Sequence, residues 1–231
     1  MYTDEEVPST FGYGSDHKLA PLAEQMAIAQ KIFPQLESFE ESAAAKELQL
    51  GAEGKFLIAR WQNIAPTYNE AVEVILAKLS EQRGGRFKNE GRDLLGYDLL
   101  RQTTKKTEMF QKLGDEQKGH NVLVVDAQFG LRHRGKSVRR ARVVMETNEV
   151  GLGAFELGFM LLTHPDRLQS GVALWIHAIG DESTPGADGV FSHAPFFYFH
   201  YAYLKFSMGR VNVPHNFYSS ASAFMASSPL E

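Results

Sequence analysis

Apolar side chains recur at helical spacing through most of the first half of the chain. Residues 22–33 carry one every three or four positions, until a proline interrupts the pattern. An acid-rich stretch that ends near Leu50 indicates a second helix, and residues 68–79 form the clearest apolar stripe in the chain. Residues 97–112 repeat this period, while the short run at 55–61 is typical of a strand. The first half is therefore predicted to be mainly helical.

The second half of the chain changes character. Residues 121–128 and 172–179 are nearly continuous apolar runs, which predicts two buried strands. Residues 152–163 are almost wholly apolar as well, and their length predicts a buried helix. Because three such segments must cover one another, we expect the two strands to share one sheet with this helix packed on it. Aromatic residues crowd the chain after Gly189 and predict strands and hairpins.

These patterns predict an α+β fold. We expect a mainly helical N-terminal half and, in the C-terminal half, a mixed or antiparallel sheet with packed helices. Residues 1–18 are polar and rich in Gly and Ser, so they are expected to form a flexible or docked N-terminal arm. A helical region at 19–118 and an α+β region at 119–231 are then expected to form one compact domain.

The composition is that of a globular protein, with 43% hydrophobic and 23% charged residues in a chain of 231. The absence of cysteine excludes disulfides and thiolate zinc sites. Four of the eight histidines lie in the last 55 residues, but none has a recognised metal-ligand spacing, so no metal site is predicted. No apolar run reaches about 18 residues and the start is acidic and polar, so we expect no membrane partner and a cytoplasmic location.

Positive charge is concentrated between residues 132 and 142, which we call the basic segment. It contains six Lys or Arg and no acid, whereas the remaining 18 basic and 28 acidic residues carry a net charge of −10. A helix predicted over 137–146 places most of its cations opposite its apolar side chains. A local positive patch on an acidic body favours an anionic ligand.

The basic segment overlaps the pattern of a P-loop, Gly-x-x-x-x-Gly-Lys-Ser, which runs from Gly130 to Ser137. In a P-loop, Lys136 would reach the outer phosphates and Ser137 would hold Mg²⁺. Asp181 and Glu182 follow the apolar run at 172–179. In nucleotide-binding enzymes, a carboxylate at the end of an apolar strand orients Mg²⁺, and these two residues are candidates for that role. This alternative predicts an NTP-binding enzyme with nucleotide and Mg²⁺ as cofactors; without it, no cofactor is predicted.

Three features disfavour the P-loop. Bulky side chains fill the loop interior, only 94 residues follow Ser137, and those residues are rich in aromatics rather than alternating strands and helices. A phosphate or polyanion site needs only a helix start and several cations. Our first hypothesis is therefore a binding protein for phosphate-bearing ligands or another polyanion, such as nucleic acid. The predicted anion-binding residues are Arg132, His133, Arg134, Lys136, Ser137, Arg139, Arg140 and Arg142.

A third hypothesis gives these cations no external ligand. Arginines on a helix of an acidic protein often pair with carboxylates of the same chain, and the protein is then structural or binds a protein partner. The candidate carboxylates are Glu156, Asp181 and Glu182. Glu156 lies within the apolar helix and needs a partner if buried, for which an arginine of the basic segment is the natural candidate. The sequence identifies no catalytic residue and leaves open whether the protein is an enzyme.

Overall fold

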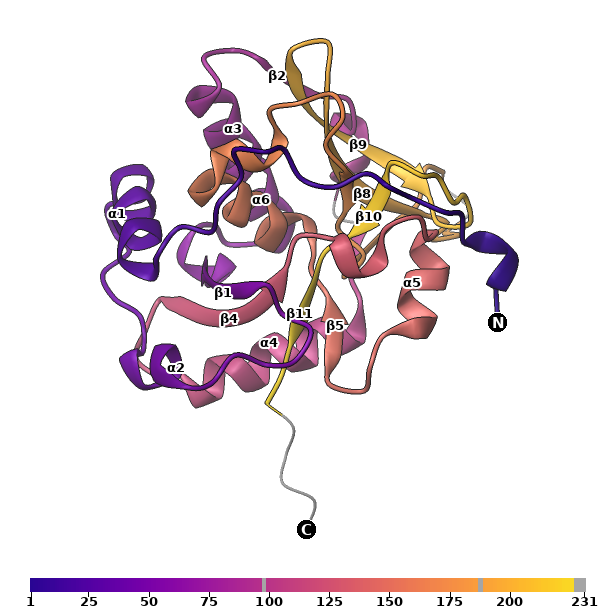
Figure 1. Cartoon of the computed structure of the whole chain (residues 1–231). Coiled ribbons are helices and arrows are strands. Elements are labelled where there is room, and N and C mark those ends of the chain that lie inside the picture. The colour runs from indigo at the N-terminus through magenta and orange to yellow at the C-terminus, as the bar shows by residue number, and fades with distance from the viewer. Residues whose placement is uncertain (97–98, 187–188, 227–231) are drawn as a thin grey trace.

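The computed structural model describes residues 1–96, 99–186 and 189–226 (Figure 1). Within these residues the chain forms six α-helices and two β-sheets. The helices are α1 Leu22–Ile32, α2 Glu41–Ala45, α3 Tyr68–Gln82, α4 Thr104–Glu116, α5 Val138–Val144 and α6 Ala154–Thr163. The chain also forms short 3₁₀ turns, among them η4 Leu131–His133 and η5 Pro165–Leu168.

The smaller sheet has four strands in the order β1-β4-β11-β5, and every pairing in it is antiparallel. Its strands are β1 Gly54–Ala59, β4 Val122–Gln128, β5 Glu149–Gly151 and β11 Ser222–Phe224. The long pair β1 and β4 is apolar and almost entirely buried, as a strand covered on both faces must be.

The larger sheet has seven strands and mixes parallel with antiparallel pairings. Its main path runs β10-β6-β8-β7-β3, and β9 pairs with both β8 and β2. Its strands are β2 Phe87–Asn89, β3 Leu100–Gln102, β6 Trp175–His177, β7 Asp181–Ser183, β8 His193–His200, β9 Tyr203–Arg210 and β10 Tyr218–Ser220. The hairpin of β8 and β9 carries most of the aromatic residues that follow Gly189.

Helix α6 lies at the centre of the fold. All ten of its residues are buried, and it packs against α1, α3 and β1 (Figure 1). Helix α3 begins with a capping box between Thr67 and Glu70, which satisfies its first free amide groups. One cluster of buried side chains extends from Met26 to Ala223, so helices and strands from both halves of the chain share a core.

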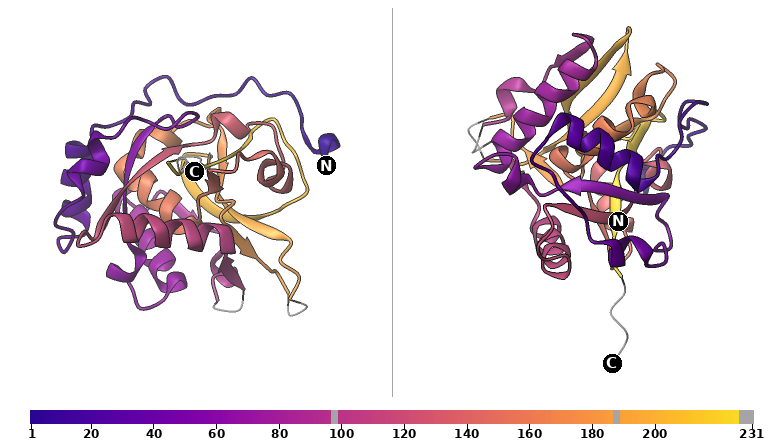
Figure 2. Two further views of the ribbon diagram at one scale, coloured as in Figure 1. Left: turned by 90° about the horizontal axis from the view of Figure 1, so that it is seen from below. Right: turned by 90° about the vertical axis from the view of Figure 1, so that its left-hand side faces the viewer.

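The N-terminal arm crosses the outside of the molecule from α1 to α5 (Figure 1, Figure 2). The Phe11 ring packs on the Phe217 ring in a tilted arrangement with centroids 3.9 Å apart, and the Leu174 amide donates a hydrogen bond to the Gly12 carbonyl. These contacts place the acidic start of the chain beside the basic segment.

The expected division into a helical first half and a sheet-bearing second half is wrong. Strands β1, β2 and β3 lie in the first half, so helices are spread through the chain and strands dominate its C-terminal half without being confined to it. Leu100, expected within a helix, begins β3 and pairs with Ser183. The expected start of that helix at Tyr97 lies outside the described residues. A three-residue strand depends on a distant partner, which local periodicity does not reveal.

The expected common sheet for residues 121–128 and 172–179 is also wrong. Strand β4 belongs to the four-stranded sheet and β6 to the seven-stranded sheet. Helix α6 packs on β1, the neighbour of β4. Both apolar runs are buried, but different neighbours cover them, because burial requires apolar contacts and does not specify which strand supplies them. No helix among the described residues is long and apolar enough to cross a bilayer.

Candidate functional site

The basic segment leaves β4 through a tight turn and enters a short helix. Gly130 and Gly135 have φ values of 134° and 77°, in the left-handed range that glycine adopts without strain. A Cβ on Gly135 would overlap the carbonyl oxygen of Val7, so the arm approaches this turn closely. Ser137 caps α5, its hydroxyl accepting a hydrogen bond from the Arg140 amide.

Two carboxylates of the N-terminal arm lie on this segment. Glu5 accepts hydrogen bonds from Arg139 Nε at 2.6 Å and from Ser137 Oγ at 2.6 Å. Glu6 lies 3.0 Å from Lys136 Nζ and 3.2 Å from Arg140 Nε. The hydrogen bond from Arg139 holds the pKa of Glu5 below its usual value, although burial of that carboxyl opposes the effect.

The backbone of the arm pairs with the same segment. Glu6 and Lys136 form an antiparallel bridge, the Val7 amide donates to the Gly135 carbonyl at 2.9 Å, and the Ser137 amide donates to the Glu5 carbonyl at 3.0 Å. The arm is therefore held by main-chain hydrogen bonds and by charge together, as an extended peptide is held on an exposed strand edge.

The first residues of the segment turn toward a different carboxylate, Glu149 on β5. His133 Nε2 lies 2.6 Å from Glu149 Oε1, and Arg132 Nε lies 3.0 Å from Glu149 Oε2. Ser222 on β11 also donates to Glu149. Burial raises the pKa of this carboxyl, but the hydrogen bond and charge of His133, with the contacts of Ser222 and Arg132, outweigh it and lower the pKa to about 2.

The end of the segment is tied to β7. Arg142 donates to the carbonyls of Ile179 and Asp181 at 3.0 and 2.8 Å, and its Nη1 lies 3.4 Å from Glu182 Oε1. Of the three candidate carboxylates, Glu182 is therefore paired with an arginine of the segment. In the part of the chain that the structure describes, Arg134 alone among the segment's cations has no ion pair, and its side chain is exposed.

The two residues that a P-loop would use are thus engaged within the chain. Lys136 is paired with Glu6, and the Ser137 hydroxyl donates to Glu5. Strand β4, which leads into the loop, has antiparallel neighbours on both sides, whereas a P-loop belongs to a parallel sheet flanked by crossover helices. The antiparallel neighbours of β4 and the internal pairing of Lys136 and Ser137 do not match a P-loop.

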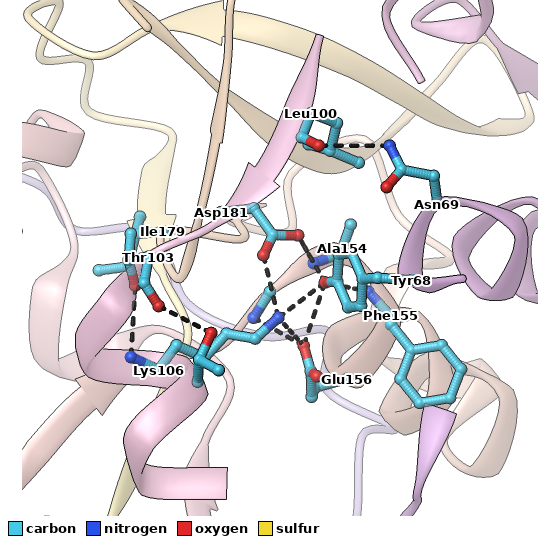
Figure 3. A network of polar contacts seen from close by, with 12 residues as sticks. Tyr68, Asn69, Leu100, Thr103, Lys106, Ala154, Phe155, Glu156, Ile179 and Asp181 are labelled. Carbon is cyan, nitrogen blue, oxygen red and sulfur yellow. Dashed lines mark hydrogen bonds and ion pairs between the residues drawn. The ribbon is translucent and has the colours of Figure 1, made fainter. Parts of the chain in front are cut away.

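Glu156 and Asp181 meet a lysine that sequence reasoning did not single out (Figure 3). Lys106 Nζ donates to Tyr68 Oη at 2.7 Å, to Glu156 Oε2 at 2.8 Å and to Asp181 Oδ1 at 2.9 Å. The expected arginine partner for Glu156 is therefore wrong. Lys106 falls on the buried face of α4 with Met109 and Leu113, and a lysine on an apolar face was the available signal.

This buried network also satisfies the start of α6. The Gly153 amide donates to Glu156, the Ala154 amide to Asp181 and the Phe155 amide to Tyr68 (Figure 3). These three acceptors occupy the place that an external anion would take at the start of a helix. Burial raises the pKa of Glu156, and the charge of Lys106 only partly offsets this effect. All three ammonium hydrogens of Lys106 have an acceptor, so the network holds α3, α4, α6 and β7 together and presents no open ligand position.

The histidines of the C-terminal region belong to different elements, with His177 on β6 and His193 and His200 on β8. His177 is buried, with Nδ1 3.2 Å from the Ser219 carbonyl, and burial lowers its pKa to about 4. Among the described residues, no three His, Asp or Glu side chains gather as a metal site would require.

Comparisons of the chain with protein-family models, with curated proteins and with solved structures found no match.

Proposed function

We propose that the protein binds phosphate-bearing polymers or other polyanions through the basic segment, and that residues 1–8 of its own N-terminal arm compete for that site. The observation that carries the proposal is the seating of Glu5 and Glu6. Four side chains of the segment, Lys136, Ser137, Arg139 and Arg140, donate to these two carboxylates.

Carboxylate and phosphate present oxygens in similar geometry to a guanidinium group, so a site that accepts one can accept the other. Release of residues 1–8 would free Lys136, Arg139 and Arg140, and Arg134 beside them is already without an ion pair among the described residues. Four clustered cations are enough to hold a phosphate backbone through counterion release. Arg132 and Arg142 stay paired with Glu149 and Glu182, which belong to the body of the fold.

The second candidate is that these ion pairs are only structural. It is favoured by the near-complete neutralisation of the segment by carboxylates of the same chain. The two candidates predict different effects of removing the charge of the arm. The first predicts a gain of polyanion binding, and the second predicts a loss of stability alone.

The test is a titration of a fluorescent single-stranded oligonucleotide and of inorganic polyphosphate with the wild type, a Glu5→Gln/Glu6→Gln variant and a chain lacking residues 1–8. We expect both changes to tighten binding about ten-fold or more at low salt and to steepen the salt dependence by about two released ions. A Glu24→Gln/Glu37→Gln variant changes the net charge equally at exposed positions far from the segment, so it controls for non-specific charge.

Adding Arg139→Ala and Arg140→Ala to the arm variant should return polyanion affinity to the wild-type level or below. The proposal is contradicted if the arm variant binds no more tightly than the Glu24→Gln/Glu37→Gln control while remaining folded by circular dichroism.

A further inference from the structure

A separate pocket of about 470 Å³ lies where the end of α3, the 3₁₀ turn η5 and the tip of the β8–β9 hairpin meet. It is lined by Gln82, Arg83, Gly84, Arg86, Pro165, Gln169, Phe199 and Ala202. Its volume is in the range of sites that hold small molecules. No residue of the basic segment contributes to it.

The pocket contains two arginines that lack carboxylate partners. Among the described residues, neither Arg83 nor Arg86 forms an ion pair, and Arg83 Nε is buried without a hydrogen-bond acceptor. The charge of Asp166 acts on Arg83 and partly opposes the effect of burial on its pKa. Asp166 Oδ2 lies 2.8 Å from His17 Nδ1 and accepts a hydrogen bond from the Lys18 amide at 2.9 Å, so this carboxylate contacts the N-terminal arm and forms no ion pair with Arg83.

Burial lowers the pKa of Arg83, and the charge of Arg86 lowers it further, so the two guanidinium groups lie close enough to repel each other. Arginine nonetheless remains protonated in proteins. Two arginines in one pocket, neither of them in an ion pair among the described residues, favour a dianion over a monoanion. The absence of ion pairs distinguishes the two arginines of the pocket from the basic segment, where all but one of the cations are paired with carboxylates.

The frame of the pocket is rigid on the side of Arg83. Arg83 Nη2 donates to the Pro165 carbonyl at 2.6 Å, and Gln169 Nε2 donates to the same oxygen at 3.1 Å. Gln82 Nε2 donates to the Leu162 carbonyl at the end of α6. Phe199 and Pro165 contribute apolar surface to the lining of the pocket.

We propose that this pocket binds a small phosphomonoester whose alcohol part is aromatic or apolar. The phosphate would accept hydrogen bonds from the guanidinium groups of Arg83 and Arg86, whose planar forks match phosphate oxygens. The organic part would lie against Phe199 and Pro165. A phosphomonoester is a dianion above a pH of about 6 and offers three acceptor oxygens, which suits two unpaired arginines.

The experiment is calorimetric titration of the full chain with phenyl phosphate, with inorganic phosphate and benzoate as comparison ligands. We expect saturable binding of phenyl phosphate, weaker binding of inorganic phosphate because it lacks the apolar part, and the weakest binding of benzoate because it is a monoanion. Phenyl phosphate affinity should rise between pH 5 and pH 7.5 as the second phosphate proton leaves.

Arg86→Gln should weaken phenyl phosphate binding about ten-fold or more, because a charge-assisted hydrogen bond is lost at an exposed side chain that the fold does not need. Arg83→Lys keeps the charge but removes the planar guanidinium fork, and it should weaken binding as well. Arg92→Gln removes an exposed arginine that belongs neither to this pocket nor to the basic segment, and it should leave affinity unchanged. Equal affinity in wild type and Arg86→Gln, or no saturable binding of phenyl phosphate at millimolar concentration, overturns the proposal. So does an Arg92→Gln variant that weakens binding as much as Arg86→Gln.

Discussion

Lys106 Nζ lies 2.9 Å from Asp181 Oδ1, and neither side chain is exposed to solvent. The two residues are 75 positions apart in the chain, on α4 and β7. Tyr68 and Glu156 complete the network, so three helices and a strand depend on one buried ammonium group.

Lys106→Met should be strongly destabilising. Removal of the ammonium group leaves Asp181 and Glu156 buried without a cation, which typically costs about 3–5 kcal/mol. Urea unfolding measures the loss, and Lys105→Met on the exposed side of the same helix is the matched control, expected to change stability by less than about 0.5 kcal/mol. A Lys106→Met protein within about 1 kcal/mol of wild type would show that the network is not needed for the fold.

Glu149 should make folding sensitive to acid. Its pKa in the folded protein is about 2, below the ordinary value of 4.5, so the charged carboxylate stabilises the fold above pH 4.5 and this stabilisation is lost as the pH falls toward 2. The pKa difference corresponds to about 3 kcal/mol. Glu149→Gln should lose about this much at pH 7 and flatten the stability profile between pH 4.5 and 2. Glu146→Gln, which changes a mostly exposed carboxylate, should retain the wild-type profile.

Arg142→Met should destabilise the protein while Arg134→Met should not. Arg142 donates to two carbonyls of the buried stretch 179–181, and removal of the guanidinium leaves those acceptors unsatisfied at a cost of about 2–3 kcal/mol. Arg134 is exposed, so its loss should change stability by less than about 0.5 kcal/mol. Thermal unfolding of the two variants decides this, and equal melting temperatures would show that Arg142 has no structural role.

The two-residue turn between β8 and β9 should be improvable. Tyr201 and Ala202 have φ values of 49° and 64°, a left-handed conformation that costs non-glycine residues about 1 kcal/mol each. The sequence Asn-Gly is preferred at such turns, so Tyr201→Asn/Ala202→Gly should stabilise the protein by about 1 kcal/mol. Ala202→Val should have the opposite effect. A lower melting temperature for the Asn-Gly variant would contradict the prediction.

The position of the basic segment could be predicted from the sequence, because a cluster of six cations and a serine before an amphipathic run are local features. Its surroundings could not. Glu5 and Arg139 are 134 positions apart, and whether an acidic arm docks on a basic turn depends on the path of the chain between them. Lys106 was overlooked for the same reason: its partners come from three other elements.

The sequence by itself determined the place of several helices and of the longer buried apolar runs, since periodicity and composition act over a few residues, but it did not reveal the short strand that begins at Leu100. The clear stripe at 68–79 became α3, and the apolar run at 152–163 became the buried helix α6. Only the tertiary structure decided that β4 and β6 lie in different sheets, that Glu5 and Glu6 neutralise the basic segment, and that Arg83 and Arg86 keep no carboxylate among the described residues. Strand pairing and charge pairing are contacts between distant residues, and their free energy depends on what else is buried beside them.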